Sequence, residues 1–311
     1  MANILVTGAA GFIGSHTVDQ LLAAGHTVVG VDNFRTGRRQ NLAAAVRAAR
    51  FTLHEIDVAA PGALDRLVAA AQPDAIIHLA ALVSVQESMT DPALNFALNV
   101  QATHLVAEAA RAQVVARVVF ASSAAIYGDT TDLPIREATE KHPISPYGAA
   151  KLASEALLLG HGAAFGFTVR CQRYFNVFGP RQDPASPYSG VISIFDRRYR
   201  EAKAVTIYGD GRQTRDFISV HDVARANVIA ATRPGIASGA ANICTGRATS
   251  LLEVVGVFQR HYPQLAAPTH GAPRSGDIVH SRGTPDAAAA ALGFRAEVAV
   301  ETGLEELIRV G

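Results

Sequence analysis

The stretch TGAAGFIGS, residues 7–15, decides the fold, because it joins a short apolar strand to the start of a helix. Gly8, Gly11 and Gly14 suit a tight turn, since a residue without a Cβ adopts backbone conformations that other residues avoid. The turn also presents backbone N–H groups and the positive end of a helix dipole, which together suit a phosphate. The spacing is GxxGxxG rather than GxGxxG, but its position at the first strand-to-helix junction predicts a dinucleotide-binding loop rather than a purely structural turn.

After this loop, short β-branched runs alternate with amphipathic helical stretches. Several of the runs are almost continuously apolar, which suits strands of a parallel sheet that are buried on both faces. The alternation predicts a doubly wound, Rossmann-like α/β parallel sheet. The predicted helices include a long one that carries Leu94, Leu98, Leu105 and Val106. The predicted strands are residues 3–7, 27–31, 51–56, 74–79, 117–121 and 168–173.

The alternation breaks after Gly179, where proline and glycine become frequent. We expect residues 1–178, with about 214–245 returning to them, to form the cofactor-binding domain. Residues 179–213 and 246–311 are expected to form a smaller mixed α/β lobe that binds the substrate. A chain of 311 residues is long enough for this division.

The composition excludes several classes of function. Lysine and arginine number 28 against 27 acidic residues, so the net charge of +1 attracts neither nucleic acid nor an anionic membrane. There is no apolar stretch long enough to span a bilayer and no secretory signal at the start. Two cysteines form neither a disulfide framework nor a zinc site, which favours the cytoplasm. No HExxH motif occurs among 11 histidines, so we expect no metal, and His221 and Asp222 are expected to start a helix.

Two aspartates end predicted strands. Asp32 lies 18 residues after the last glycine of the loop, where a carboxylate accepts hydrogen bonds from an adenosine ribose and repels a 2′-phosphate. This favours NAD over NADP. The nearby arginines, which are able to bind such a phosphate, weaken the preference: Arg35, Arg38 and Arg39. Asp57, after the third strand, is expected either to contact adenine or to cap the next helix.

Tyr147 and Lys151 are four residues apart, which places them on one face of a helix. A phenol with a pKa of ~10 is a poor base near neutrality, but an adjacent ammonium and a positive nicotinamide stabilise the phenolate. Ser123, at the end of the fifth strand, is placed to hold a substrate hydroxyl. The alternative is an ordinary amphipathic helix with an exposed lysine, which is weakened because the chain has only three lysines.

Taken together, nine segments resemble the NAD-dependent nucleotide-sugar epimerase/dehydratase family of extended short-chain dehydrogenases/reductases. The resemblance covers essentially the full length and is greatest to UDP-glucose and UDP-N-acetylglucosamine 4-epimerases. The segments are TGAAGFIG (7–14), VDN (31–33), HLAA (78–81), Asn99, SSAAIYG (122–128), SPYGAAK (145–151), RYFNVFGPRQ (173–182), YGDGRQTRDFISVHDVA (208–224) and RSGDIVHS (274–281).

The resemblance implies that Tyr147 is the catalytic base, that Lys151 binds the nicotinamide ribose and lowers the pKa of the phenol, and that Ser123 hydrogen-bonds the sugar hydroxyl. It implies NAD as the cofactor, bound by Gly8, Gly11, Phe12, Ile13, Gly14, Asp32, Asn33, Asp57, Val58, Leu79, Ala80, Ala81, Asn99, Tyr147, Lys151 and Tyr174. It implies a UDP-sugar substrate, bound by Ser84, Ser123, Tyr147, Asn176, Val191, Tyr208, Arg215, Arg274, Asp277 and Ser281.

Within the substrate set, the resemblance assigns the diphosphate to Asn176, Arg215 and Arg274, and the uridine ribose to Asp277. Guanidinium groups suit this task because their planar forks match phosphate oxygens. Tyr208 is expected either to stack on uracil or to pack as a strand aromatic in the core.

The reaction subclass is inferred from the residues just before Tyr127-Gly128, the YG that closes the fifth-strand motif. Dehydratases of the family carry an acidic pair there, whereas this chain has Ala124 and Ala125. Tyr127 has no lysine four residues on, so it is not the base. We therefore expect reversible C4 epimerisation of a UDP-hexose through a transient 4-keto intermediate with bound NAD. The alternatives are a UDP-uronate 4-epimerase, another nucleotide-sugar oxidoreductase or dehydratase, and a non-catalytic NAD-binding sensor.

Ser281 bears on the sugar specificity, because the resemblance places it beside the C2 substituent of the hexose. A small side chain there is expected to admit an N-acetyl group, so that UDP-GlcNAc and UDP-GalNAc are substrates as well as UDP-Glc and UDP-Gal. The helices at residues 92–112 and 147–163 carry apolar residues around much of their circumference. In the family such helices form a four-helix interface, so we expect a homodimer.

Overall fold

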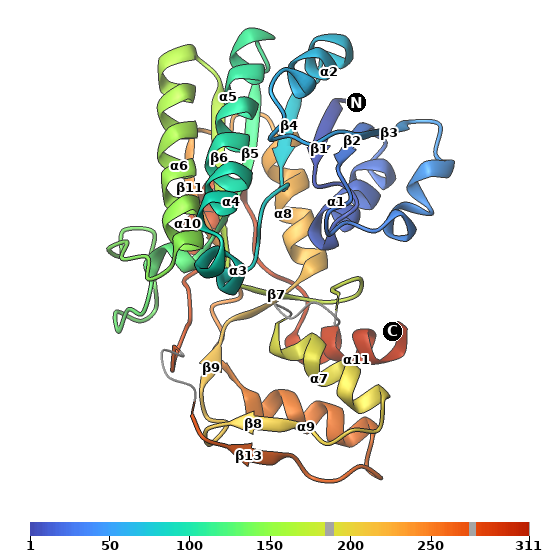
Figure 1. Cartoon of the computed structure of the whole chain (residues 1–311), viewed down its shortest axis with the longest axis vertical. Helices are drawn as coiled ribbons and strands as arrows, with labels where there is room; N and C mark the ends of the chain where they lie inside the picture. Colours follow the sequence, from blue (N-terminus) through green and yellow to red (C-terminus); the bar gives the residue numbers. More distant parts are fainter. Residues whose placement is uncertain (184–189, 274–277, 311) are drawn as a thin grey trace.

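The computed structural model describes residues 1–183, 190–273 and 278–310. Its centre is a seven-stranded sheet in which every neighbouring pair is parallel (Figure 1). The six predicted strands are all present, with ends that differ by at most two residues. In spatial order the strands are β11 (Gly239–Ile243), β6 (Thr168–Tyr174), β5 (Arg117–Ser123), β4 (Ala75–His78), β1 (Asn3–Thr7), β2 (Thr27–Asp32) and β3 (Phe51–Glu55).

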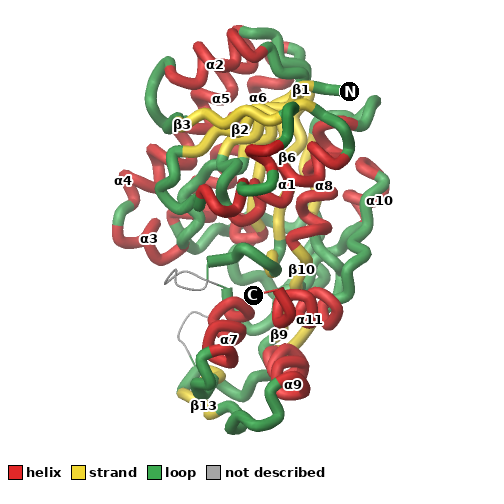
Figure 2. Tube along the Cα trace, turned by 90° about the vertical axis from the view of Figure 1, so that its right-hand side faces the viewer, coloured by secondary structure: helices red, strands yellow, loops and turns green. Residues whose placement is uncertain are grey.

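Helices cover both faces of the sheet, which Figure 2 shows as a strand layer between helical layers. Side chains alternate along each strand. Ile4 and Val6 of β1 belong to the core cluster under α1 (Phe12–Ala23), α8 (Val220–Thr232) and α10 (Asp286–Leu292). Leu5 belongs to the opposite cluster, under α2 (Ala63–Ala71), α5 (Ala102–Ala112) and α6 (Pro146–Phe165). The predicted doubly wound fold class is confirmed.

The strand order reverses between β1 and β4, since β2 and β3 follow on one side and β5 and β6 on the other. Thr7 and His78 are register partners at this point. Open parallel α/β sheets bind ligands beyond the carboxyl ends of the strands at such a switch. The glycine loop follows β1 directly, so the topology places it at the crevice.

Two elements depart from the sequence prediction. The seventh strand, β11, was not predicted, because its sequence GAANI lacks the β-branched pattern of a strand. The predicted long helix is divided into α4 (Pro92–Asn95), a π-helical segment η3 (Phe96–Gln101) and α5. Helical periodicity alone does not reveal a π-helical turn, and the buried residue of this segment is the polar Asn99.

A smaller lobe lies beyond the carboxyl edge of the sheet (Figures 1 and 2). It has its own apolar core, centred on Phe195, Phe217 and Phe258. Its β8–β13 pair is parallel and its β9–β12 pair antiparallel, so it is mixed α/β as predicted. Its elements are α7 (Val191–Arg200), β8 (Thr206–Tyr208), β9 (Thr214–Arg215), β12 (Thr249–Ser250), α9 (Leu251–His261), β13 (Thr269–Gly271) and α11 (Val300–Val310).

Short elements connect the two parts. β7 (Asn176–Phe178) follows β6, and β10 (Phe217–Ser219) precedes α8. These two strands form a parallel pair. His221 and Asp222 lie in the first turn of α8, behind the N-cap Ser219, as predicted. No helix in the described ranges has the length and hydropathy needed to cross a membrane. The remaining short elements are η1 (Arg39–Leu42), η2 (Ala45–Arg47), α3 (Val85–Thr90) and η4 (Ala124–Tyr127).

Candidate active site

The glycine loop is packed too closely for side chains. Gly8 has a φ of +69°, and a Cβ added to it would lie 2.8 Å from the backbone nitrogen of Ala80. A Cβ on Gly14 would lie 1.9 Å from the carbonyl oxygen of Gly8. The hydroxyl of Thr7 accepts hydrogen bonds from the backbone of Leu79 and Ala80, at 3.2 Å each, and so ties the loop to the end of β4. The result is a backbone cradle at the N-terminus of α1, which suits a pyrophosphate.

Asp32 is held rigidly at the end of β2. Its two carboxylate oxygens accept hydrogen bonds from the backbone N–H groups of Ala10 and Phe34, each at 2.8 Å. Burial raises the pKa of Asp32, and these two donors oppose that shift. Each oxygen retains a second lone pair, so the carboxylate is able to accept ribose hydroxyls as well.

The three arginines after Asp32 are each paired with an acid. Arg38 contacts Asp183 at 2.7 Å. Arg35 pairs with Glu87 and Arg39 with Glu55. A 2′-phosphate would have to compete with these carboxylates, so the feature that weakened the preference for NAD is offset in the folded chain.

Three further residues of the predicted cofactor set, Asp57, Val58 and Tyr174, differ in their surroundings. Asp57 is exposed and accepts a hydrogen bond from Ala59 N–H at 2.9 Å. It caps a turn, and the expectation that it caps the next helix is wrong, because the N-cap of α2 is Gly62. Val58 is packed in the core beneath α2, which leaves only its backbone for a ligand. Tyr174 donates its hydroxyl to Asn227 of α8 at 2.6 Å.

Asn99 lies on the π-helical segment and is buried. Its amide nitrogen donates to Leu82 O at 3.0 Å and to Asn95 Oδ1 at 2.8 Å. Within the described part of the chain, its Oδ1 has no hydrogen-bond partner, and neither has the buried Oγ of Ser122. A buried acceptor without a donor is costly. Together with the glycine cradle, these atoms fit a cofactor that carries ribose hydroxyls.

Tyr147, Lys151 and Ser123 come together at the carboxyl end of β5. The Lys151 side chain is 3% exposed, and its Nζ donates to the carbonyl oxygen of Ala121 at 2.9 Å. That Nζ lies 5.9 Å from the centre of the Tyr147 ring. Burial raises the pKa of Tyr147, whereas a hydrogen bond with Ser123 lowers it. Burial lowers the pKa of Lys151 to about 7, while Glu155 opposes that change.

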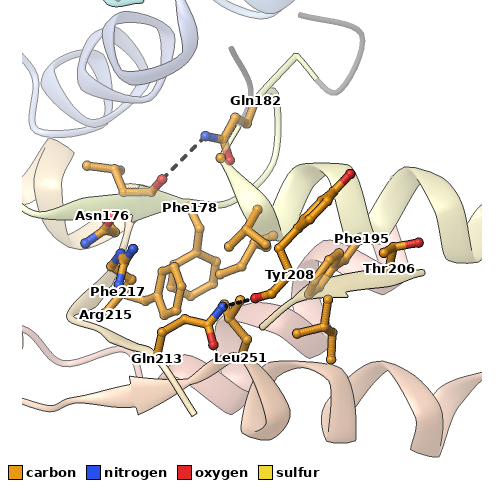
Figure 3. Close-up of a pocket in the computed structure, with 15 residues that line it drawn as sticks. Asn176, Phe178, Gln182, Phe195, Thr206, Tyr208, Gln213, Arg215, Phe217 and Leu251 are labelled. Atoms are coloured by element: carbon orange, nitrogen blue, oxygen red, sulfur yellow. Dashed lines mark hydrogen bonds between the residues drawn. The ribbon is translucent and has the colours of Figure 1, made fainter. Parts of the chain in front are cut away.

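A cavity of about 280 Å³ lies in the smaller lobe, just beyond this cluster. Ser123 is the register partner of Tyr174, and β7 begins two residues later. Asn176, on β7, lines the cavity together with three other predicted substrate residues: Val191, Tyr208 and Arg215. Asn176 and Arg215 lie together at one side, with the Tyr208 ring at the other (Figure 3).

Tyr208 is 41% exposed, so the expectation that it packs in the core is wrong. Ser84 is buried as the N-cap of α3 and accepts a hydrogen bond from Glu87 N–H at 2.8 Å. Ser281 donates its backbone N–H to Thr214 O at 3.1 Å, beside β9 and outside the set of residues that line the cavity. Arg274 and Asp277 lie outside the described residues.

Two glutamines of the cavity were missed by the sequence analysis. Gln213 donates to the Tyr208 carbonyl at 2.7 Å, and Gln182 to the Val177 carbonyl at 3.5 Å (Figure 3). The buried Oε1 of Gln182 has no partner among the residues described. Both lie in segments that carry the family resemblance, RYFNVFGPRQ and YGDGRQTRDF, so their position was the available signal.

This combination defines a class of protein: a dinucleotide-dependent enzyme with a tyrosine and a lysine on one helix and a separate cavity beside them that carries an amide and a guanidinium. A family model described as the NAD dependent epimerase/dehydratase family matches residues 4–244. The chain belongs to this family. NAD is its cofactor, and the predicted family, enzyme class and cofactor are confirmed.

Comparison with known proteins gives related matches over nearly the whole chain. A UDP-glucose 4-epimerase of Mycolicibacterium smegmatis is 38% identical over 307 residues, covering 98% of this chain and 96% of that protein. The structure of a UDP-glucose 4-epimerase from Thermotoga maritima with UDP-glucose has a TM-score of 0.92, 35% identity and coverage of 99% and 97%. A UDP-N-acetylglucosamine 4-epimerase from Methanobrevibacter ruminantium, in complex with UDP-N-acetylmuramic acid, has a TM-score of 0.93, 32% identity and the same coverage.

Replacing Gly14 by alanine tests the cradle. The added Cβ meets backbone on the other side of the loop and cannot be relieved by a side-chain rotation. We expect at least about a tenfold loss of NAD affinity, equivalent to about 1.4 kcal/mol, measured by calorimetric titration of NAD into apoprotein. Gly256→Ala on α9 is the matched control, because its Cβ meets no atom within 4 Å among the described residues. Unchanged NAD affinity in Gly14→Ala would contradict the assignment of the loop.

Proposed function

We propose that the protein interconverts UDP-hexoses that differ in configuration at C4, through a transient 4-keto sugar. The observation that carries the proposal is the meeting of Ser123, Tyr147 and Lys151 at the end of β5, next to a cavity lined by Asn176 and Arg215. The first three residues suit proton removal from a hydroxyl, and the cavity suits a diphosphate. The relatives named above support the same activity.

In this proposal Tyr147 removes the proton of the C4 hydroxyl and later returns it. The hydroxyl of Ser123 already interacts with the phenol, so a substrate hydroxyl placed between them is aligned for transfer. The chemistry that NAD would supply when bound is reversible hydride transfer at C4, and inversion would result when the hydride returned to the other face of the sugar ring. The phenol needs positive charge nearby to ionise, because burial otherwise raises its pKa. Lys151 is the protein group that we assign to this task.

The nucleotide is assigned to the cavity and the hexose to the space between the cavity and Tyr147. Asn176 and Arg215 offer an amide and a guanidinium for the diphosphate, and the half-exposed Tyr208 ring offers a stacking surface for uracil. This division lets the sugar ring turn over while its anchor stays fixed, as inversion at C4 demands. We propose residues 179–213 and 246–311 as the nucleotide-sugar lobe, except that α10 within this range packs on the central sheet with α8 and β11.

The sugar specificity is part of the proposal. Ser281 follows a segment that runs alongside β9, where Arg215 lies, so its side chain is near the expected position of the hexose. A serine leaves room for an N-acetyl group at C2. We therefore propose that the enzyme acts on UDP-GlcNAc and UDP-GalNAc as well as on UDP-Glc and UDP-Gal.

We also propose a homodimer through α5 and α6, which lie side by side (Figure 1). Leu158 of α6 is buried within the chain, but small residues are exposed along the same helix, namely Ala149, Ala153, Ala156, Gly160 and Ala163. Phe165 at the end of α6 is 53% exposed, and Phe96 before α5 is 57% exposed. Small residues allow the helices of a second copy to approach closely.

Both cysteines are free and buried, and we propose the cytoplasm as the location.

The base is tested by Tyr147→Phe. This variant keeps the ring but cannot take a proton, so turnover should fall by about 10²–10⁴-fold, while NAD affinity is retained. Turnover is followed by proton NMR of the anomeric signals of UDP-glucose and UDP-galactose without added reductant. Tyr262→Phe in the smaller lobe is the control and should match the parent. Undiminished epimerisation by Tyr147→Phe would refute the mechanism, and a parent protein that binds NAD and UDP-sugars without turnover would be a sensor.

The proposed room for an N-acetyl group beside Ser281 is tested by Ser281→Tyr. A bulky side chain should reduce turnover of the acetylated pair by at least about tenfold and leave UDP-Glc and UDP-Gal little changed. The parent and the variant are assayed on the UDP-Glc, UDP-GlcNAc and UDP-glucuronate pairs. Equal loss on the two hexose pairs, or no loss, contradicts the position of Ser281. A parent that prefers the uronate pair would replace the hexose by a uronate in the proposed function.

Ala156→Arg tests the dimer. An arginine on the exposed face of α6 would place an unpaired charge in the proposed interface, which is strongly destabilising. We expect a dimer for the parent and a monomer for the variant in light scattering at micromolar concentration. Ala69→Arg, on the exposed side of α2 and far from α6 in the fold, is the control and should stay dimeric. A monomeric parent would end the proposal.

A further inference from the structure

Two oppositely charged residues, Glu155 and Arg173, are buried beneath the proposed catalytic pair of Tyr147 and Lys151. On α6, Tyr147, Lys151 and Glu155 are spaced four residues apart and therefore share one face. Glu155 is 3% exposed, and Arg173, near the end of β6, is 6% exposed. Arg173 holds Glu155 with two hydrogen bonds, from Nη2 to Oε2 at 2.8 Å and from Nε to Oε1 at 3.0 Å.

Arg173 is itself fixed from the far side. Its Nη1 donates to the Tyr127 hydroxyl at 2.8 Å and to the Glu137 carbonyl at 3.1 Å. The Tyr127 hydroxyl in turn donates a hydrogen bond to Oδ1 of Asn242 on β11 at 2.7 Å. The guanidinium therefore has little freedom, and the Glu155 carboxylate is held on the face of α6 that carries Lys151.

We propose that Glu155 is a positioning residue for the reaction: its charge favours the protonated form of the buried Lys151, and Arg173 holds the Glu155 carboxylate in place. This inference rests on the proposed function, which gives the Lys151 ammonium its task. Apart from Glu155, the neighbours of Lys151 Nζ among the described residues are the Ala121 carbonyl and the rings of Phe120 and Tyr147, whose centres lie 4.9 and 5.9 Å away. Those contacts do not replace a counter-charge in a site from which water is excluded.

The charges of these residues also favour the active form of the base. Lys151, Glu155 and Arg173 carry +1, −1 and +1, so they sum to +1 while Tyr147 is neutral. Ionisation of Tyr147 brings the buried sum to zero. Loss of the proton from Lys151 also brings the sum to zero. Glu155, one helical turn from Lys151, opposes the loss of that proton and so favours ionisation of Tyr147 instead.

Other ionisable groups face Tyr147, Lys151, Glu155 and Arg173, and a pH experiment has to allow for them. His78 on β4 is buried, and its pKa is lowered to about 3, so it stays neutral. Burial raises the pKa of Cys171 on β6 and raises that of Tyr127 to about 12, so both stay protonated. Glu137 and Lys141, from the segment before α6, also act on this region, and burial lowers the pKa of Lys141.

The direct test measures the protonation of Lys151. The chain has three lysines, so labelling with ¹³Cε-lysine gives three NMR signals, and Lys151→Met assigns the one of interest. In the NAD-bound protein, Glu155→Gln should lower the titration midpoint of Lys151 by at least about one pH unit. The upper limb of the kcat–pH profile should move downward by a similar amount. The Lys203 signal, from the exposed side of the smaller lobe, is the internal control.

A second variant separates charge from packing. Glu155→Gln leaves the buried Arg173 without its carboxylate counter-charge, which by itself destabilises the fold. Glu155→Gln combined with Arg173→Gln removes both charges, so that no buried charge is left without its counter-charge at these two positions. The Lys151 midpoint should still fall in this double variant, and Glu155→Asp should recover part of the shift. A midpoint equal to the parent's in the double variant would overturn the proposal and leave the pair a structural role.

The two proposals fail in distinguishable ways. Lys151 titration is read without turnover, so a shifted midpoint in a protein that does not epimerise UDP-hexoses refutes the proposed function alone. Normal epimerisation by the parent with an unmoved Lys151 midpoint in the double variant refutes the role of Glu155 alone.

Discussion

The structure depends on an ammonium buried at the end of a parallel strand. Lys151 donates to Ala121 at the carboxyl end of β5, which fixes the first turns of α6 against the sheet. Burying an ion without a partner costs several kcal/mol. That cost is offset by a carbonyl, an aromatic face and the carboxylate of Glu155. The arrangement therefore makes sense only if the charge is needed where the phenol of Tyr147 also lies.

The sheet separates two binding tasks and keeps them in register. The glycine cradle, Asp32 and Asn99 gather around the reversal of strand order between β1 and β4. The cavity lies on the other side of the β5 end, reached through β6 and β7, which pass directly from Tyr174 to Asn176. Because β6 is paired on both sides within the sheet, the proposed nucleotide anchor cannot move far from the proposed reacting groups. A fixed anchor with a less constrained hexose is what an inversion at one carbon needs.

Much of the sheet was predictable because buried parallel strands have a simple signature. The runs ILVT and AIIH are apolar on both faces, and their flanking helices keep a regular period. β11 was not predictable in this way, because Gly239 and the alanines after it pair with β6 only through tertiary contact. The π-helical turn at Asn99 escaped for a related reason, since it depends on side-chain hydrogen bonds to Asn95 and Leu82 rather than on periodicity.

The site divides in the same way. Residue type and spacing indicated Tyr147 and Lys151, and the fold brings them together with Ser123, a distant part of the chain. The ion pairs of Arg35, Arg38 and Arg39 were not foreseen, because their acids lie on other elements. The same holds for Glu155 and Arg173, which are 18 residues apart in the sequence and meet only across the α6–β6 packing.

In the proposed mechanism, a phenol and a bound nicotinamide act on one carbon of a tethered hexose. The most direct measurement follows the hydrogen on that carbon. UDP-glucose deuterated at C4 is incubated with the protein in ordinary water, and the UDP-galactose formed is examined by mass spectrometry and NMR. If the proposed mechanism operates, the UDP-galactose formed retains deuterium at C4. Loss of the label to water, or formation of product that carries hydrogen at C4, would contradict it.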